Sequence, residues 1–175
     1  KNFELCYGPT TLDNFSIFDV LPSPFEKIQI VDVGARYTGD ERYASLLASN
    51  MAKLTGFDQD ERQVQHLTKR YPKHKFVSAF IADGAERKFY KCQYGGCSSL
   101  FRPDPSIINQ FTGMSTTKGS HFDVVSEEIV QTVKLDDVID IKGCDYLKID
   151  VQGAELEVLK GAKETLKDCL VVELE

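Results

Sequence analysis

Short apolar runs alternate along the chain with segments whose apolar positions follow helical spacing. The run "IQIVDV" stops at Gly34, which is typical of a buried parallel strand. Three such runs occur in the first half, at residues 28–33, 54–58 and 75–82. Two segments with apolar positions three and four residues apart lie between them, at residues 41–54 and 60–71. Asp60 can cap the second of these helices and Pro72 ends it.

The pattern changes after the third strand. The segments "RKFYKC" and "SSLF" flank Gly95-Gly96 and predict a β-hairpin. Residues 103–120 are rich in turn formers and lack periodicity, which predicts a mobile loop that could close as a lid. The remaining elements are a strand at 121–133, a helical turn at 135–139, a strand at 145–151, a helix at 154–167 and a strand at 169–175.

This order of elements predicts one α/β domain. Repeated β-α-β units form a mostly parallel, twisted sheet with helices on both faces, here with a β-hairpin insertion after the third strand. A chain of 175 residues, 42% apolar and 27% charged, can bury the core that such a domain needs. We therefore expect a single domain over residues 1–175, in which residues 1–27 are a lead-in to the core at 28–175.

Charge and cysteine content narrow the possible partners. A formal charge of -6 without a cluster of Lys and Arg argues against nucleic acid. No apolar run approaches the roughly 18 residues of a membrane span, and Lys1 opens no signal peptide. The five scattered cysteines are typical of reduced thiols, so we expect a cytoplasmic protein. Cys92 and Cys97 could form half of a zinc site, but no other pair has matching spacing, and we expect no metal.

Acidic side chains follow four of the expected strands. In open parallel sheets, ligands bind outside the carboxyl ends of the strands. The polar residues placed at those ends are Asp32, Asp58, Asp83, Asp150 and Gln152. One acid there would be an ordinary turn residue, whereas four on one rim predict a ligand with hydroxyls, an amine or a positive charge.

Two nucleotide ligands compete for this rim. A nicotinamide dinucleotide favours Gly-x-Gly-x-x-Gly, whereas this chain has Gly34 and Gly39. Asp32 would also repel a diphosphate. S-adenosylmethionine carries a sulfonium and an ammonium but no phosphate, so the acids attract it. Asp58 is placed to accept hydrogen bonds from ribose hydroxyls in either ligand, so spacing alone leaves both open.

Several motifs resemble a known family. The stretches "VDVGARYTGD", "GFDQDE", "CSSLF", "VKLDDVI" and above all "DYLKIDVQGAELEVLKGA" closely resemble FkbM-type methyltransferases, a branch of the class I S-adenosylmethionine-dependent enzymes. The resemblance covers residues 28–175 in the family's order. It implies a Rossmann-like sheet, S-adenosylmethionine as cofactor, and methylation of a hydroxyl on a small molecule, sugar or lipid-linked acceptor. Because the class I sheet usually ends in a reversed hairpin, we expect C-terminal strands to be missing from this chain.

The resemblance implies a set of site residues. Arg36 and Thr38 stand where family members commonly have Asn and Gly. The cofactor residues implied are Asp32, Gly34, Ala35, Arg36, Tyr37, Asp58, Gln59, Ala82, Asp83 and Asp150. The acceptor side is expected to include Ser98, Ser99, His121 and Gln152.

Methyl transfer from sulfur to a hydroxyl needs alignment of the acceptor and a group that accepts the hydroxyl proton. Asp150 is the first candidate for that group and Glu155 the second. Lys148 alternates with Asp150 along the strand, so both side chains point to the same face. Lys148 is therefore a further candidate catalytic residue, which either orients the carboxylate of Asp150 or pairs with it structurally. A nucleotide-dependent oxidoreductase and a non-catalytic domain with the same fold stay open as alternatives.

Overall fold

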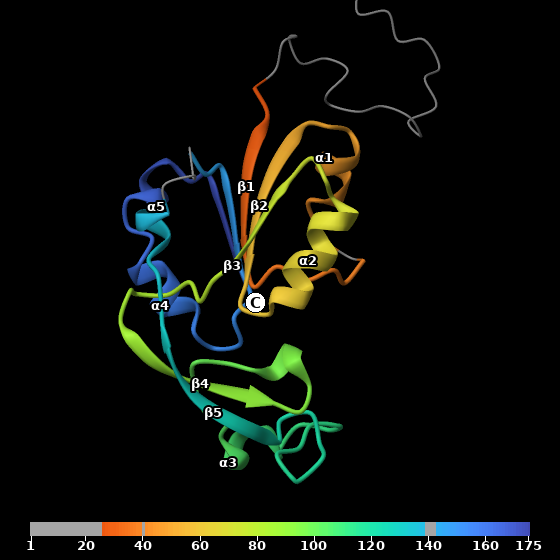
Figure 1. The fold of residues 1–175 in the computed structure, drawn as a ribbon, viewed down its shortest axis with the longest axis vertical. Helices are drawn as coiled ribbons and strands as arrows, with labels where there is room; N and C mark the ends of the chain where they lie inside the picture. Colours follow the sequence, from red (N-terminus) through yellow and green to blue (C-terminus); the bar gives the residue numbers. More distant parts are fainter. Residues whose placement is uncertain (1–25, 40, 139–142) are drawn as a thin grey trace, which may run out of the picture.

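The computed structural model describes residues 26–39, 41–138 and 143–175, and Figure 1 shows their arrangement. The lead-in predicted for residues 1–27 lies almost entirely outside the described residues, as does Cys6. The central sheet has five parallel strands in the order β3-β2-β1-β6-β7. The strands are β1 (Ile28–Val33), β2 (Ala52–Asp58), β3 (Lys75–Ser78), β6 (Tyr146–Ile149) and β7 (Val171–Leu174). The predicted Rossmann-like α/β fold is confirmed.

Helices cover both faces of this sheet, as Figure 1 shows. One face carries α1 (Ala44–Ala48) and α2 (Glu61–Arg70), and the other carries α4 (Glu155–Lys160) and α5 (Thr165–Asp168). Successive β1 side chains point to opposite faces. Ile30 therefore packs in the cluster with Tyr43 of the α1 side, whereas Val31 and Val33 pack with Val158 of α4.

A separate two-stranded antiparallel sheet lies beyond the carboxyl ends of the parallel strands (Figure 1). We call residues 86–131 the insertion lobe. Its elements are β4 (Glu86–Cys92), the 3-10 helix η3 (Gly95–Cys97), α3 (Pro105–Ile108) and β5 (Val124–Gln131). A second 3-10 helix, η4 (Leu135–Asp137), follows the lobe. The lobe closes over the edge of the sheet at which ligands bind in this class of fold.

The hairpin exists, but one predicted strand partner is wrong. β4 pairs along its length with β5, from Glu86 opposite Gln131 to Cys92 opposite Val124. The "SSLF" segment contributes a single bridge, in which the backbone groups of Ser99 and Tyr90 exchange two hydrogen bonds. Residues 93–123 therefore form the long connection of the hairpin, and α3 lies within the loop predicted at 103–120.

Two predicted helices are shorter in the structure. The helix expected at 41–54 is wrong after Ala48, because Asn50 adopts a φ of +59°, a conformation that ends helices, and β2 begins at Ala52. The helix expected at 154–167 divides at Gly161 into α4 and α5. A Cβ on Gly161 would lie 2.0 Å from the carbonyl oxygen of Ala82, so only glycine permits this approach.

Candidate functional site

A pocket lies between the carboxyl edge of the sheet and the insertion lobe. Three neighbouring strands, β2, β1 and β6, end in its wall. The lining residues named above at the sheet edge are Gly34, Arg36, Asp58, Gln59, Asp150 and Gln152, and those from the lobe include Gly95, Gly96, Ser98, Ser99 and Leu100. The parallel topology therefore brings together residues from four regions far apart in the sequence.

Gly34 allows the chain to turn at the end of β1. It has a φ of +89°, and a Cβ at this position would lie 1.9 Å from the carbonyl oxygen of Asp150. The N–H groups of Gly34 and Ala35 both donate to the carbonyl oxygen of Phe57, at 2.8 Å each. Ala35 itself is buried. The turn after β1 is thus tied to β2 on one side and pressed against the end of β6 on the other.

Asp58 is a buried carboxylate in the pocket wall. Its Oδ1 accepts from the N–H of Asp60 at 2.6 Å, and its Oδ2 lies 3.5 Å from Nε of Arg36. Burial raises the pKa of Asp58, against the opposing effects of the Asp60 N–H and the Arg36 guanidinium. Because one oxygen is already bound to the backbone, Oδ2 is the atom available to a ligand if Arg36 moves aside.

Asp150 follows β6 and faces the same pocket. Its Oδ1 accepts from Nε2 of Gln152 at 2.6 Å, and its Oδ2 lies 3.7 Å from Nζ of Lys148. Gln152 adopts a φ of +60°, which is uncommon for a residue with a side chain and is often found at functional sites. Glu155 accepts from the N–H groups of Val151 and Gly153, at 3.2 and 2.9 Å. Glu155 therefore holds the turn that carries Asp150 and Gln152.

A buried polar row lies behind Asp150. Lys148 sits opposite Asp32 in the sheet, and its Nζ lies 3.8 Å from Oδ1 of Asp32. The hydroxyl of Tyr43 donates to the other oxygen of Asp32. Asp32 is only 1% exposed, and its Oδ1 has no hydrogen-bond partner among the residues that the structure describes. Asp32 is not part of the pocket lining, and the Lys148 ammonium lies between it and Asp150.

Burial makes the Asp32 carboxyl hold its proton more tightly than an exposed carboxyl does. Desolvation raises its pKa to about 6, although Lys148 and the Tyr43 hydroxyl act in the opposite direction. Between pH 4 and pH 6 the unfolded chain therefore releases this proton while the folded chain keeps it, and stability falls as the pH rises through that window. Well above pH 6 the carboxyl is ionised in the folded state too, and the full free-energy cost of burying its charge lowers the stability of the fold.

Asp32→Asn is expected to remove this pH dependence. The amide preserves an acceptor for Tyr43 and carries no charge. Relative to the wild type, the free energy of unfolding of the variant should rise by about 2 kcal/mol between pH 4 and pH 7. Urea denaturation across that range measures the difference. Parallel curves for the two proteins would show that Asp32 is already ionised at low pH.

The insertion lobe supplies the other wall of the pocket. Ser98 and Ser99 are buried there, and their Oγ atoms accept from the N–H groups of Cys92 and Phe101, both at 3.0 Å. Each hydroxyl keeps a proton that it can donate. Phe80 and Phe89 form an edge-to-face pair at 4.9 Å and give this wall an apolar section. The wall can therefore contact both flat apolar and hydroxylated groups.

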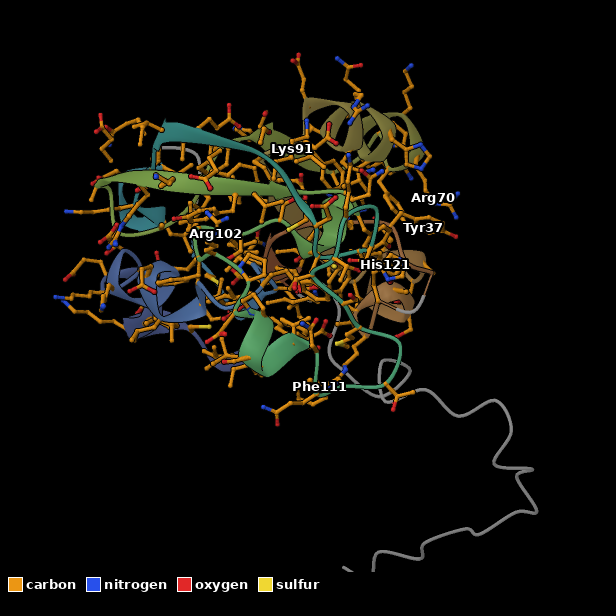
Figure 2. All side chains as sticks on the ribbon, turned by 90° about the horizontal axis from the view of Figure 1, so that it is seen from below. Tyr37, Arg70, Lys91, Arg102, Phe111 and His121 are labelled. Atoms are coloured by element: carbon orange, nitrogen blue, oxygen red, sulfur yellow. The ribbon has the colours of Figure 1, made fainter. Side chains whose placement is uncertain are left out.

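Eight of the expected site residues do not line the pocket: Asp32, Ala35, Lys148 and Glu155, described above, and Tyr37, Ala82, Asp83 and His121. Asp83 pairs with Arg87, and Ala82 is buried next to it. The Tyr37 ring lies beneath the Arg70 guanidinium, 3.8 Å from centroid to Cζ, and Figure 2 shows the two side by side at the periphery. The His121 ring lies 5.5 Å from that of Tyr94.

Sequence reasoning missed the apolar part of the lining. Val33 and Phe57 end their strands beside the expected acids, and the segment from Ala79 to Ile81 follows β3. These residues lie next to the polar strand ends in the sequence, which is a signal that could have identified them. Phe89 and Leu100 carry no such signal, since their place in the pocket depends on how the lobe folds back.

The described residues offer little evidence for other kinds of site. Among them, no group of three or more His, Cys, Asp or Glu side chains is arranged to hold a metal ion. No helix in the described ranges has the length and apolarity required to cross a membrane.

Comparison with known proteins identifies the domain. Searches of curated proteins and of solved structures gave no match. The sequence model described as "Methyltransferase FkbM domain" matches residues 32–175, a range that includes β1 from Asp32 onward, the pocket and the insertion lobe. Since this match covers most of the 175 residues, the chain belongs to the FkbM methyltransferase domain family.

Proposed function

We propose that the pocket binds S-adenosylmethionine and that the protein methylates a hydroxyl of a small-molecule, sugar or lipid-linked acceptor. The observation that carries this proposal is the meeting of Asp58 and Asp150 in one pocket, on the two strands that flank β1. Two carboxylates on either side of a glycine turn fit a ligand with ribose hydroxyls at one end and positive charge at the other.

The charge of the pocket supports this ligand over a dinucleotide. The charged residues of its lining are Asp58, Asp150 and Arg36, so the lining has a net negative charge. Arg36 lies against Asp58, and Lys148 behind the wall lies between Asp32 and Asp150. Among the described lining residues, the only cation is therefore paired with a carboxylate. A diphosphate would meet repulsion in a partly desolvated site.

The residues present fit the cofactor at both ends. Asp58 would accept hydrogen bonds from the ribose hydroxyls, and these hydroxyls would replace Arg36 at Oδ2. Phe80 and Phe89 offer an apolar surface for a flat base. Gly34 lets the turn after β1 lie directly against the carbonyl oxygen of Asp150, which holds the two pocket walls together. When bound, S-adenosylmethionine supplies a methyl group activated by the sulfonium.

The protein's part in the reaction is to hold the acceptor and accept its proton. Asp150 would take the hydroxyl proton at a carboxylate oxygen, while Gln152 orients that carboxylate from the other side. Lys148 keeps Asp150 in place and balances the negative charge of Asp32. The protons of Ser98 and Ser99 can hydrogen-bond further hydroxyls of the acceptor.

Asp58→Asn is the variant that tests the cofactor site. The amide oxygen can still accept from the N–H of Asp60, so the turn is preserved. The ribose hydroxyls lose a charged acceptor, and binding of S-adenosylhomocysteine should weaken by about 1.5 to 3 kcal/mol. Calorimetry measures the dissociation constant.

Asp83→Asn is the matched control for that experiment. Asp83 is also an acid after a strand in the sequence, but it pairs with Arg87 away from the pocket. Its substitution should leave the affinity for S-adenosylhomocysteine unchanged. An unaltered dissociation constant in Asp58→Asn, or equal losses in both variants, would remove Asp58 from the ribose site.

A further inference from the structure

Two cysteines meet at the start of neighbouring strands, on the edge of the sheet opposite the pocket. Cys144 precedes β6 and Cys169 precedes β7, each two residues before the paired residues Tyr146 and Val171. The N–H groups of Leu170 and Val171 both donate to the carbonyl oxygen of Asp145, at 3.0 Å. The backbone segments that carry the two thiols are therefore bound side by side.

The two side chains also share one packing environment. Cys144 is 2% exposed and belongs to the core cluster on the α4 and α5 face, and Cys169 packs against the same cluster. Sγ of Cys169 lies 3.8 Å from the carbonyl oxygen of Asp145, the residue next to Cys144. Burial first, and then the neighbouring Cys169, raise the pKa of Cys144 to about 12.

We propose that Cys144 and Cys169 form a reversible disulfide that links the start of β6 to the start of β7. Adjacent strands are spaced about 4.8 Å apart, and disulfides span Cα separations of roughly 4.4 to 6.8 Å. Both cysteines are free in the structure. The bond can therefore form without a change in how the strands pair.

A low-molecular-weight disulfide such as oxidised glutathione can supply the oxidising power. The Cys169 thiolate, which is only partly buried, attacks one sulfur, breaks the glutathione disulfide and releases one glutathione thiolate. Cys144 then loses its proton to water and attacks Sγ of Cys169, which releases the second glutathione. The protein gives up two electrons and two protons, and one oxidised glutathione becomes two reduced molecules. Because the pKa of Cys144 is raised, the fraction of its reactive thiolate increases with pH, and the second step is faster at higher pH.

One cysteine of the pair, Cys144, borders a hollow. A hollow among the described residues is lined by Asp136, Gly143, Cys144, Thr165 and Asp168, so it reaches Cys144 beside the end of α5. The disulfide would fix β7, which lies at the edge of the sheet, to the core strand β6. A crosslink between positions 144 and 169 also restricts the unfolded chain, which stabilises the folded state.

The test is peptide mapping of the full chain after incubation with oxidised glutathione under native conditions. Free thiols are blocked and the protein is digested with trypsin without reduction. The expected product is the peptide of residues 143–148 joined to the peptide that begins at Asp168. Its mass should be 2 Da below the sum of the two peptides. Dithiothreitol should separate them, and the oxidised protein should melt several degrees higher than the reduced one.

Matched variants make the result decisive. Cys169→Ser and Cys144→Ala should each abolish the linked peptide and the shift in melting temperature, and Cys97→Ser should leave both unchanged. The proposal is overturned if both peptides are recovered separately blocked, or if glutathione stays attached to Cys169 without release. A linked peptide that forms only in urea would overturn it as well, because the pairing would then belong to the unfolded chain.

Discussion

Asp150→Asn is expected to lower turnover by about 100-fold or more while the fold and much of the affinity for S-adenosylhomocysteine remain. The carboxylate is the proton acceptor in the proposed reaction, and an amide cannot take that proton. Its oxygen can still accept from Nε2 of Gln152, so the turn after β6 stays ordered. Methyl transfer to an identified acceptor, followed at saturating cofactor, measures the loss.

Glu155→Gln is the control that separates the two candidate acids. Glu155 uses its Oε1 to accept from the N–H groups of Val151 and Gly153, and the amide oxygen of glutamine can do the same. Turnover should therefore stay close to that of the wild type. If Glu155→Gln stops the reaction while Asp150→Asn does not, Glu155 accepts the proton and the assigned roles are reversed.

Gly34→Ala is expected to destabilise the fold by more than about 3 kcal/mol and to abolish cofactor binding. The added Cβ would lie 1.9 Å from the carbonyl oxygen of Asp150, so either the turn after β1 or the end of β6 must move. Both form the pocket wall, and no flexible side chain can absorb the clash. Urea denaturation gives the change in stability, and calorimetry gives the change in affinity.

Gly39→Ala isolates the part of this effect that comes from the left-handed backbone. Gly39 has a φ of +90°, almost the same as that of Gly34, but its Cβ would meet the Tyr37 hydroxyl at 3.8 Å, an ordinary contact. We expect Gly39→Ala to lower the free energy of unfolding by about 1 to 2 kcal/mol. Equal losses in the two variants would mean that backbone strain, and not the approach of Asp150, makes Gly34 necessary.

The sheet could be predicted because its strands are short apolar runs that end at glycine or acidic residues. The strand that pairs with β4 could not be predicted. β4 and β5 are separated by residues 93–123, and their pairing depends on contacts across the lobe. The end of α1 was missed for a different reason. Met51 and Leu54 continue the helical spacing, but Asn50 turns the backbone, so Met51 precedes β2 and Leu54 is buried within it together with Ala52.

The candidate site was predictable where strand ends alone determine position. Asp58 and Asp150 meet in the pocket because β2 and β6 both flank β1 and run parallel to it. Asp83 does not, because β3 ends at Ser78 and the chain bends before Arg87 binds the carboxylate. The ion pair between Arg36 and Asp58 could not be inferred from spacing, since it depends on a long side chain that crosses the pocket.

Titration calorimetry of the wild-type protein tests most directly whether this pocket binds S-adenosylmethionine. S-adenosylhomocysteine and NAD are titrated separately under the same conditions, because Asp58 could serve the ribose of either. We predict one saturable site for S-adenosylhomocysteine and no measurable heat with NAD, since the lining of Asp58, Asp150 and Arg36 disfavours a diphosphate. Saturable binding of NAD without binding of S-adenosylhomocysteine would contradict S-adenosylmethionine as the ligand of the pocket.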